Sequence, residues 1–155
     1  MVNQGSINPD NCKRNAQLMA NIDMKAAAGA ERGQKEGRAA IIRNIAEVPW
    51  LEFPNHFGGA LSKPLVTPDS AGSKHLDYRI SCYQPMAYVA THTHTLQEQI
   101  YHVLDGEGLM KVDGKDHVVR KHDVVYLPPG IEHTIQNSGL TDLVFLVITS
   151  PTQDA

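Results

Sequence analysis

Short strand-like runs, separated by glycine and proline turn signals, dominate the chain from residue 77 onward. They cover residues 78–83, 87–94, 99–104, 110–112, 117–119, 124–127, 134–137 and 143–149. Two of them flank Asp113-Gly114, a pair that favours a two-residue β-hairpin because both residues tolerate positive φ. Many short strands at regular spacing predict an all-β sandwich or closed barrel, and they exclude a sheet whose strands alternate with helices.

The residues before these runs have a different pattern. Apolar residues between Leu18 and Met24 form a loose helical stripe, and the glycines that follow at positions 29, 33 and 37 weaken it. We therefore predict an N-terminal arm over residues 1–44, helical or extended, followed by one barrel domain over residues 45–152. Within that domain, residues 48–54 resemble a first strand and residues 55–68 resemble a loop.

Composition and charge limit the classes of partner. The net charge is −3, and residues 1–43 hold seven Lys/Arg against four acidic residues, whereas the rest holds seven against thirteen. An acidic folded region lacks the basic face of a nucleic-acid reader. No apolar run is long enough to cross a bilayer, no secretory signal is visible, and two cysteines do not make a disulfide framework. We expect a cytoplasmic protein without a nucleic-acid or membrane partner.

Three histidines form the most informative cluster in the sequence. His92 and His94 occupy positions i and i+2 of a predicted strand, so both imidazoles face the same side and can hold one ion. Gln99 begins the next strand after a short turn, and His133 follows the rigid sequence Pro128-Pro129-Gly130. This spacing predicts a site for a single divalent metal ion. Nickel, iron, manganese and zinc are all candidates for that ion.

These residues resemble the two sequence motifs of the cupin superfamily. The first motif matches at His92, His94, Gln99 and Gly106. The second matches at Asp123, Pro128, Gly130, His133 and Asn137. The resemblance implies a single cupin jelly-roll barrel whose interior supplies the metal ligands His92, His94 and His133, with a fourth from the strand after the first histidine pair. The chain departs from the family at His122, where a glycine is usual, and there we expect a changed turn.

The fourth ligand is a second departure from the family pattern. Most metal cupins have a glutamate where this chain has Gln99, and Glu98 comes directly before it. Because adjacent strand residues face opposite sides, only one of the two can point into the barrel. The spacing to Gly106 favours Gln99, and a looser turn would bring in Glu98 instead.

An amide ligand has a chemical consequence for the reaction class. Three neutral imidazoles and an amide leave the charge of a divalent ion uncompensated, which makes a stronger Lewis acid and disfavours a ferric state. The pattern therefore favours a metal-dependent lyase or isomerase acting on a small oxygenated, acidic metabolite, and at the site it resembles pectin-degradation cupins. The alternatives are an iron-dependent cupin dioxygenase and a non-catalytic module that binds or senses a small molecule.

Two further residues are candidate catalytic groups. Tyr101 lies two residues after Gln99 on the same face, where its phenol serves either as a general acid or base or as a core hydrogen-bonding group. One of Tyr78 and Arg79 faces inward, and an inward Arg79 would bind a substrate carboxylate. Trp50 is expected to pack the arm onto the barrel, across a dimer contact in the homodimer that we predict.

Overall fold

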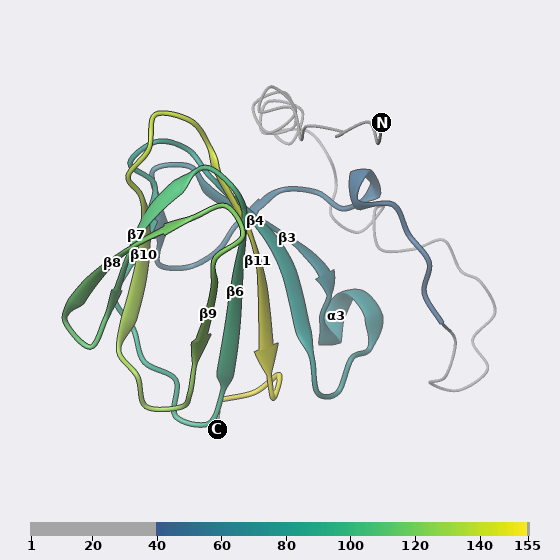
Figure 1. The fold of residues 1–155 in the computed structure, drawn as a ribbon. Helices are drawn as coiled ribbons and strands as arrows, with labels where there is room; N and C mark the ends of the chain where they lie inside the picture. The colour runs from purple at the N-terminus through teal and green to yellow at the C-terminus, as the bar shows by residue number, and fades with distance from the viewer. Residues whose placement is uncertain (1–39, 155) are drawn as a thin grey trace.

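The computed structural model describes residues 40–154, and these form two antiparallel β-sheets that face each other across one core (Figure 1). The six-stranded sheet has the order β1 (Leu51–Glu52), β3 (Ala60–Val66), β4 (Asp77–Tyr83), β11 (Leu143–Ser150), β6 (Glu98–Asp105) and β9 (Val124–Leu127). The five-stranded sheet has the order β2 (His56–Phe57), β5 (Tyr88–Val89), β10 (His133–Asn137), β7 (Glu107–Val112) and β8 (Lys115–Arg120). This arrangement confirms the predicted all-β jelly roll.

Helical structure is limited to two short pieces among residues 40–154. They are the 3-10 helix η2 (Ile45–Glu47) and the single-turn helix α3 (Pro68–Ala71), which lies beside β3 (Figure 1). No helix in this part of the chain has the length and apolar character needed to span a membrane. The arm predicted over residues 1–44 lies outside the described residues, apart from its last five.

The core lies between the sheets because inward and outward residues alternate along the strands, as β6 shows. In β6 the side chains of Gln99, Tyr101 and Val103 are buried, whereas Glu98 and Ile100 are exposed. This period of two is the geometric property of an extended chain. It carries polar Gln99 into the barrel at one end of a strand that is otherwise apolar on its inner face.

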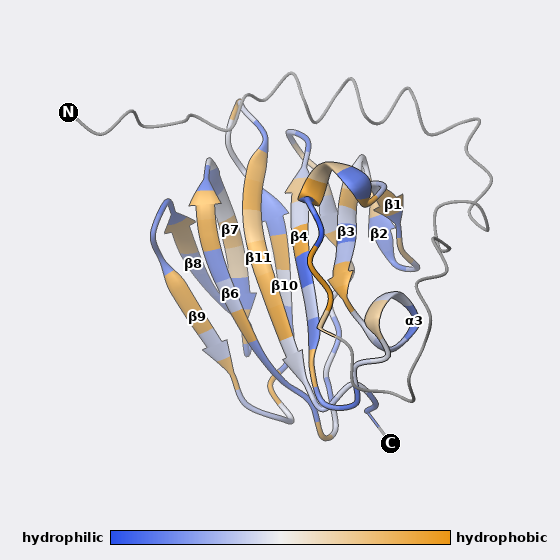
Figure 2. Cartoon of the chain, turned by 90° about the vertical axis from the view of Figure 1, so that its right-hand side faces the viewer, coloured by the Kyte–Doolittle hydropathy of each residue, from blue (hydrophilic) through white to orange (hydrophobic). Residues whose placement is uncertain are grey.

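Strand β11 explains the long apolar run near the C-terminus. It lies between β4 and β6, and its inward residues Leu143 and Phe145 join the main core. Its outward Val144 packs in a second cluster with Ile80, on the outer side of the same sheet. Because both faces are covered, β11 is hydrophobic along most of its length (Figure 2).

Trp50 packs against this second cluster within its own chain, and the Nζ of Lys63 lies 5.0 Å from the centre of its ring. These contacts account for Trp50 without a partner chain. The predicted homodimer therefore stays a prediction.

The prediction of a loop over residues 55–68 was wrong. Residues 60–66 form strand β3, which pairs with β1 through Leu61 and Ser62 and with β4 along most of its length. Pro64 lies beyond the short β1 strand and beside a register shift, so its missing N–H costs no ladder hydrogen bond on that side. Pro64 and the preceding Gly58-Gly59 pair are typical of a loop, so no pattern in the sequence indicated this strand. Its formation depends on pairing with β1 and β4.

The strand predicted over residues 87–94 is also shorter than expected. Regular pairing is confined to β5, and His92 forms an isolated bridge with His133. The hairpin at Asp113-Gly114 is confirmed, with φ of 47° and 75°. His122 adopts a φ of 77° in the turn before β9, in the left-handed region that favours glycine. The expected change in this turn stays a prediction.

Candidate metal centre

His92, His94 and His133 come together at one end of the barrel. Each offers a ring nitrogen, and these three atoms lie within 4.8 Å of one another. His133 begins β10, and it exchanges backbone hydrogen bonds of 3.0 and 2.9 Å with His92. The ring centres of His92 and His133 are 4.3 Å apart, and those of His92 and His94 are 5.0 Å apart. The structure therefore brings together the three histidines that the sequence singled out.

The Nδ1 atom of each of these histidines faces a hydrogen-bond acceptor. His92 Nδ1 lies 2.8 Å from the carbonyl oxygen of Ala90, and His133 Nδ1 lies 3.0 Å from that of Ile131. His94 Nδ1 lies 3.3 Å from a carboxylate oxygen of Asp154. A ring that donates through Nδ1 keeps its lone pair on Nε2, the arrangement that metal-binding histidines use. The Nε2 of His94 is buried and has no hydrogen-bond partner among residues 40–154.

Burial keeps the imidazoles of His92 and His133 neutral. It lowers the pKa of His133 to about 4 and lowers the pKa of His92, and the neighbouring histidines act in the same direction. The hydrogen bonds from the two rings to backbone carbonyls oppose this effect without outweighing it. Neutral imidazole is the form that binds a metal ion, so these two rings are ready for ligation at neutral pH.

Gln99 completes the polar end of the core. It is 8% exposed, and its Oε1 lies 3.0 Å from His133 Nε2. Its Nε2 donates to Thr149 Oγ1 at 3.1 Å, and Tyr101 donates its phenol proton to Oε1 at 3.3 Å. With the amide in this orientation and the His133 proton on Nδ1, an imidazole lone pair and an amide oxygen face each other as two acceptors. A cation bound by both atoms would relieve that contact, so the residues present fit a metal ion.

Glu98 lies on the opposite side of the strand. Its side chain is exposed and accepts a hydrogen bond of 2.8 Å from the phenol of Tyr126. The pair Glu98 and Gln99 thus follows the alternation of β6, with the amide inside the barrel and the carboxylate outside.

Tyr101 lies behind Gln99 in the core. Its ring stacks on Phe145 with centres 5.6 Å apart, and the residue is 5% exposed. Burial raises the pKa of its phenol well above the ordinary value. Tyr101 is therefore a protonated hydrogen-bond donor to Gln99 and is not poised to act as a base.

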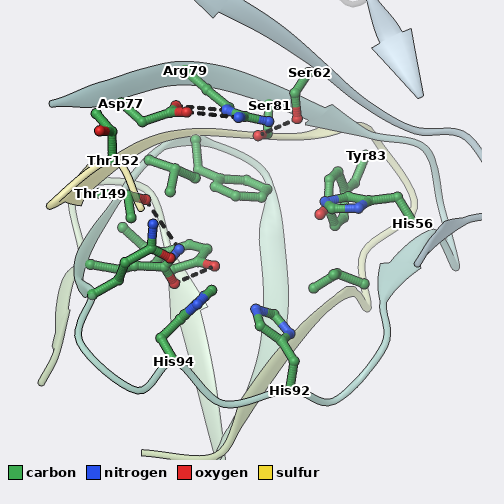
Figure 3. A pocket seen from close by; sticks show the side chains of 16 residues that line it. His56, Ser62, Asp77, Arg79, Ser81, Tyr83, His92, His94, Thr149 and Thr152 are labelled. Atoms are coloured by element: carbon green, nitrogen blue, oxygen red, sulfur yellow. Dashed lines mark hydrogen bonds and ion pairs between the residues drawn. The ribbon is translucent and has the colours of Figure 1, made fainter. Parts of the chain in front are cut away.

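A cavity of about 240 Å³ opens next to the histidines, between the inner faces of the two sheets. In Figure 3 His92 and His94 lie on one side, and Arg79, Ser81 and Ser62 lie across from them. The hydroxyl oxygens of Ser62 and Ser81 are 2.8 Å apart. The floor is apolar and includes Phe145.

Arg79 lines this cavity, as expected for an inward residue of β4. Its guanidinium makes two hydrogen bonds of 2.7 Å to the carboxylate of Asp77 (Figure 3). It also lies 4.3 Å from the ring centre of Phe53. The Asp77 carboxylate compensates its charge. A substrate carboxylate would therefore meet an ion pair instead of a free cation.

Three residues near the site had no clear signal in the sequence. His56 in β2 lines the cavity and contacts the ring of Tyr83 edge-on, with centres 6.0 Å apart. His56 falls in the loop that was predicted over residues 55–68. Strand β2 is only two residues long, which is too short to give a periodic pattern. Thr149 supports Gln99 from β11, and Asp154 contacts His94 from the end of the chain. Only the inward alternation of β11 could have suggested Thr149, and nothing in the sequence pattern indicates Asp154.

Comparison with known proteins identifies relatives of this arrangement. The model of the cupin domain matches residues 79–149. An oxalate-binding protein of Thermotoga maritima is 31% identical over 117 residues, which cover 74% of this chain and 96% of the relative.

Solved structures show the same fold. A crystal structure described as a predicted oxalate decarboxylase from Thermotoga maritima superposes with a TM-score of 0.65 at 26% identity, over 72% of this chain and 99% of the other. The structure of KdgF from Halomonas sp. has a TM-score of 0.62 at 18% identity, over 76% of this chain and 97% of the other.

Proposed function

This chain belongs to the cupin superfamily, and we propose that it is a divalent-metal-dependent enzyme of the lyase or isomerase type. The observation that carries the proposal is the convergence of three histidines and the Gln99 amide oxygen at the edge of a small cavity. In this proposal His92, His94, His133 and Gln99 hold the ion.

The ligand set suits reactions without a redox change. When bound, a divalent ion held by uncharged ligands supplies Lewis-acid polarisation of a substrate oxygen. The chain itself contributes the three imidazoles and the orientation of the Gln99 amide. The phenol of Tyr101 remains protonated and donates a hydrogen bond to Gln99 Oε1, one of the proposed ligand atoms.

The cavity suggests a small, oxygen-rich substrate. A volume of about 240 Å³ is below the range that accommodates drug-sized ligands. The wall across from the histidines presents the hydroxyls of Ser62 and Ser81 and the Arg79–Asp77 ion pair, which together offer donors and acceptors to carboxylate and hydroxyl groups. The name of the oxalate-binding relative supports an acidic metabolite of this size.

A non-catalytic role in binding a small carboxylate is the second candidate. One observation favours it. The phenol of Tyr101, the candidate general acid or base, is buried behind Gln99 and lies 3.3 Å from the Gln99 side-chain oxygen, so it already donates its proton within the core. In this role the protein would bind the ligand at the metal and leave it unchanged.

Metal content and oxygen dependence test the proposal. Protein purified without a chelating column should contain one divalent ion per chain, and His133→Ala should contain none. Small carboxylic and hydroxy acids that raise the melting temperature are then assayed for turnover after reloading with zinc or iron. Turnover with zinc under strict anaerobiosis supports the lyase or isomerase. Oxygen consumption in proportion to product would contradict the lyase or isomerase and support an iron-dependent dioxygenase. Ligand binding without turnover would favour the non-catalytic role.

A further inference from the structure

Asp154, four residues after the end of β11, lies against the turn that connects the histidine pair to Gln99. Its Oδ1 accepts hydrogen bonds from the backbone N–H groups of Leu96 at 2.8 Å and Gln97 at 3.1 Å. Its Oδ2 lies 3.3 Å from His94 Nδ1. The chain end runs beside the start of β6, which places the carboxylate there (Figure 1).

The other two histidines obtain this hydrogen bond locally. His92 and His133 each face a backbone carbonyl two residues earlier, at Ala90 and Ile131. His94 differs, because its Nδ1 partner lies sixty residues away in sequence. The tautomer and direction of His94 therefore depend on a tertiary contact, whereas those of the other two follow from the local backbone.

We propose that Asp154 is a positioning residue of the metal centre, which holds His94 with its proton on Nδ1 and its lone pair on Nε2. The buried Nε2 of His94, which has no partner among residues 40–154, is the atom so directed. This inference rests on the metal centre proposed above. The same carboxylate orders the turn at Leu96 and Gln97, so one residue positions His94 and the approach to Gln99 together.

A second contact ties the chain end to the same turn. The side-chain amide of Gln97 donates to the carbonyl oxygen of Pro151 at 3.0 Å. The side chain of Asp154 is one-third exposed, 33%, and that of His94 is 20% exposed. The contact thus lies at the rim of the barrel, where a carboxylate keeps part of its hydration and can still orient an imidazole.

Asp154→Asn separates a positioning role from a structural one. An asparagine oxygen can still accept from Leu96 and Gln97, so the turn and the melting temperature should be retained. Its NH₂ group would then face His94 Nδ1 and favour the tautomer with the proton on Nε2, so that Nε2 could no longer bind the metal. Asp116→Asn, in an exposed ion pair with Lys111 on the β7–β8 hairpin, is the matched control.

The first measurement needs no metal. Long-range ¹H–¹⁵N spectra of the metal-free protein report the tautomer of His94, whose signals are assigned by their loss in His94→Gln. We expect the Nδ1–H form in the unmodified protein and in Asp116→Asn, and a shift toward the Nε2–H form in Asp154→Asn. An unchanged Nδ1–H form in Asp154→Asn would overturn the inference.

The second measurement is the affinity for zinc, by competition with a chromophoric chelator. Loss of a group that orients a metal ligand typically weakens binding by about 10–100-fold, and we expect this for Asp154→Asn. Asp116→Asn should match the unmodified protein. Equal zinc affinity in Asp154→Asn and Asp116→Asn would overturn the inference even if the tautomer had changed. An unmodified protein that binds no zinc would overturn the metal centre itself, while the tautomer spectra would still decide the contact between Asp154 and His94.

Discussion

At the scale of single residues, the outcome at Glu98 and Gln99 shows how one position on a strand decides the charge of a site. The carboxylate points to solvent and the amide points to His133, although the two are neighbours in sequence. A buried carboxylate beside three histidines would carry a negative charge into the core. The amide supplies an oxygen without that charge, so Gln99 adds no net charge to the polar end of the core.

Replacing each of these neighbours in turn tests the fourth ligand. We expect Gln99→Ala to weaken metal binding clearly, because it removes the oxygen that faces His133. Glu98→Ala should leave the affinity near that of the unmodified protein, since the carboxylate contacts only Tyr126 among the hydrogen bonds described. Chelator competition measures both, and Gln99→Glu should retain the metal. A larger loss of affinity in Glu98→Ala would assign the ligand to Glu98.

Tyr101 offers a second test with its own control. Tyr101→Phe removes the buried donor to Gln99 Oε1, and we expect a loss of about 1 kcal/mol in the free energy of unfolding and a lower turnover rate with the metal retained. Tyr126→Phe removes an exposed phenol that donates to Glu98, so turnover should not change. Denaturant unfolding and steady-state rates report the two effects. Equal turnover in the two variants would exclude Tyr101 from the reaction.

At the scale of elements, the turns determine whether the strands meet in the correct register. Gly106 joins β6 to β7 with a φ of 84°, and an added Cβ would lie 2.5 Å from the carbonyl oxygen of Asp142. Gly114 in the β7–β8 hairpin has a φ of 75° and open space around it. Both positions need the left-handed conformation, and only Gly106 also needs the absence of a side chain.

This difference predicts unequal costs of the same substitution. Gly114→Ala should lower the free energy of unfolding by about 1–2 kcal/mol, the cost of placing an L-residue in the left-handed region. Gly106→Ala should cost about 2–4 kcal/mol, because the backbone must also move away from Asp142. Chemical denaturation of both variants measures the gap, and equal losses would contradict the close approach at Gly106.

At the scale of the whole molecule, the candidate ligands come from both sheets. His133 lies in β10 of the five-stranded sheet, Gln99 lies in β6 of the six-stranded sheet, and His92 and His94 lie on the segment that connects the sheets. An ion held by all four would connect the sheets at one end of the barrel. Metal binding should therefore stabilise the fold as a whole, beyond the loop that carries the histidine pair.

Thermal and chemical unfolding with added metal test this coupling. A ligand present at 100 times its Kd adds about 2.7 kcal/mol to the free energy of unfolding when it binds only the native state. We expect this gain with zinc in the unmodified protein, and none in His133→Ala under the same conditions. An equal gain in His133→Ala would mean that the ion binds elsewhere.

The sequence by itself determined the features that depend on local geometry. The period of two predicted the strands and that only one of Glu98 and Gln99 faces inward, and Asp113-Gly114 predicted the hairpin, because these features depend on neighbouring residues alone. The spacing of the motifs also predicted that His92, His94 and His133 lie together as candidate metal ligands.

The tertiary structure decided what depends on distant partners. Strand β3 forms despite Pro64 because β4, which follows a loop and a short helix, pairs with it. His94 is oriented by Asp154 from the end of the chain. Such contacts leave no periodic trace in the sequence, because they arise only when packing brings separate segments together.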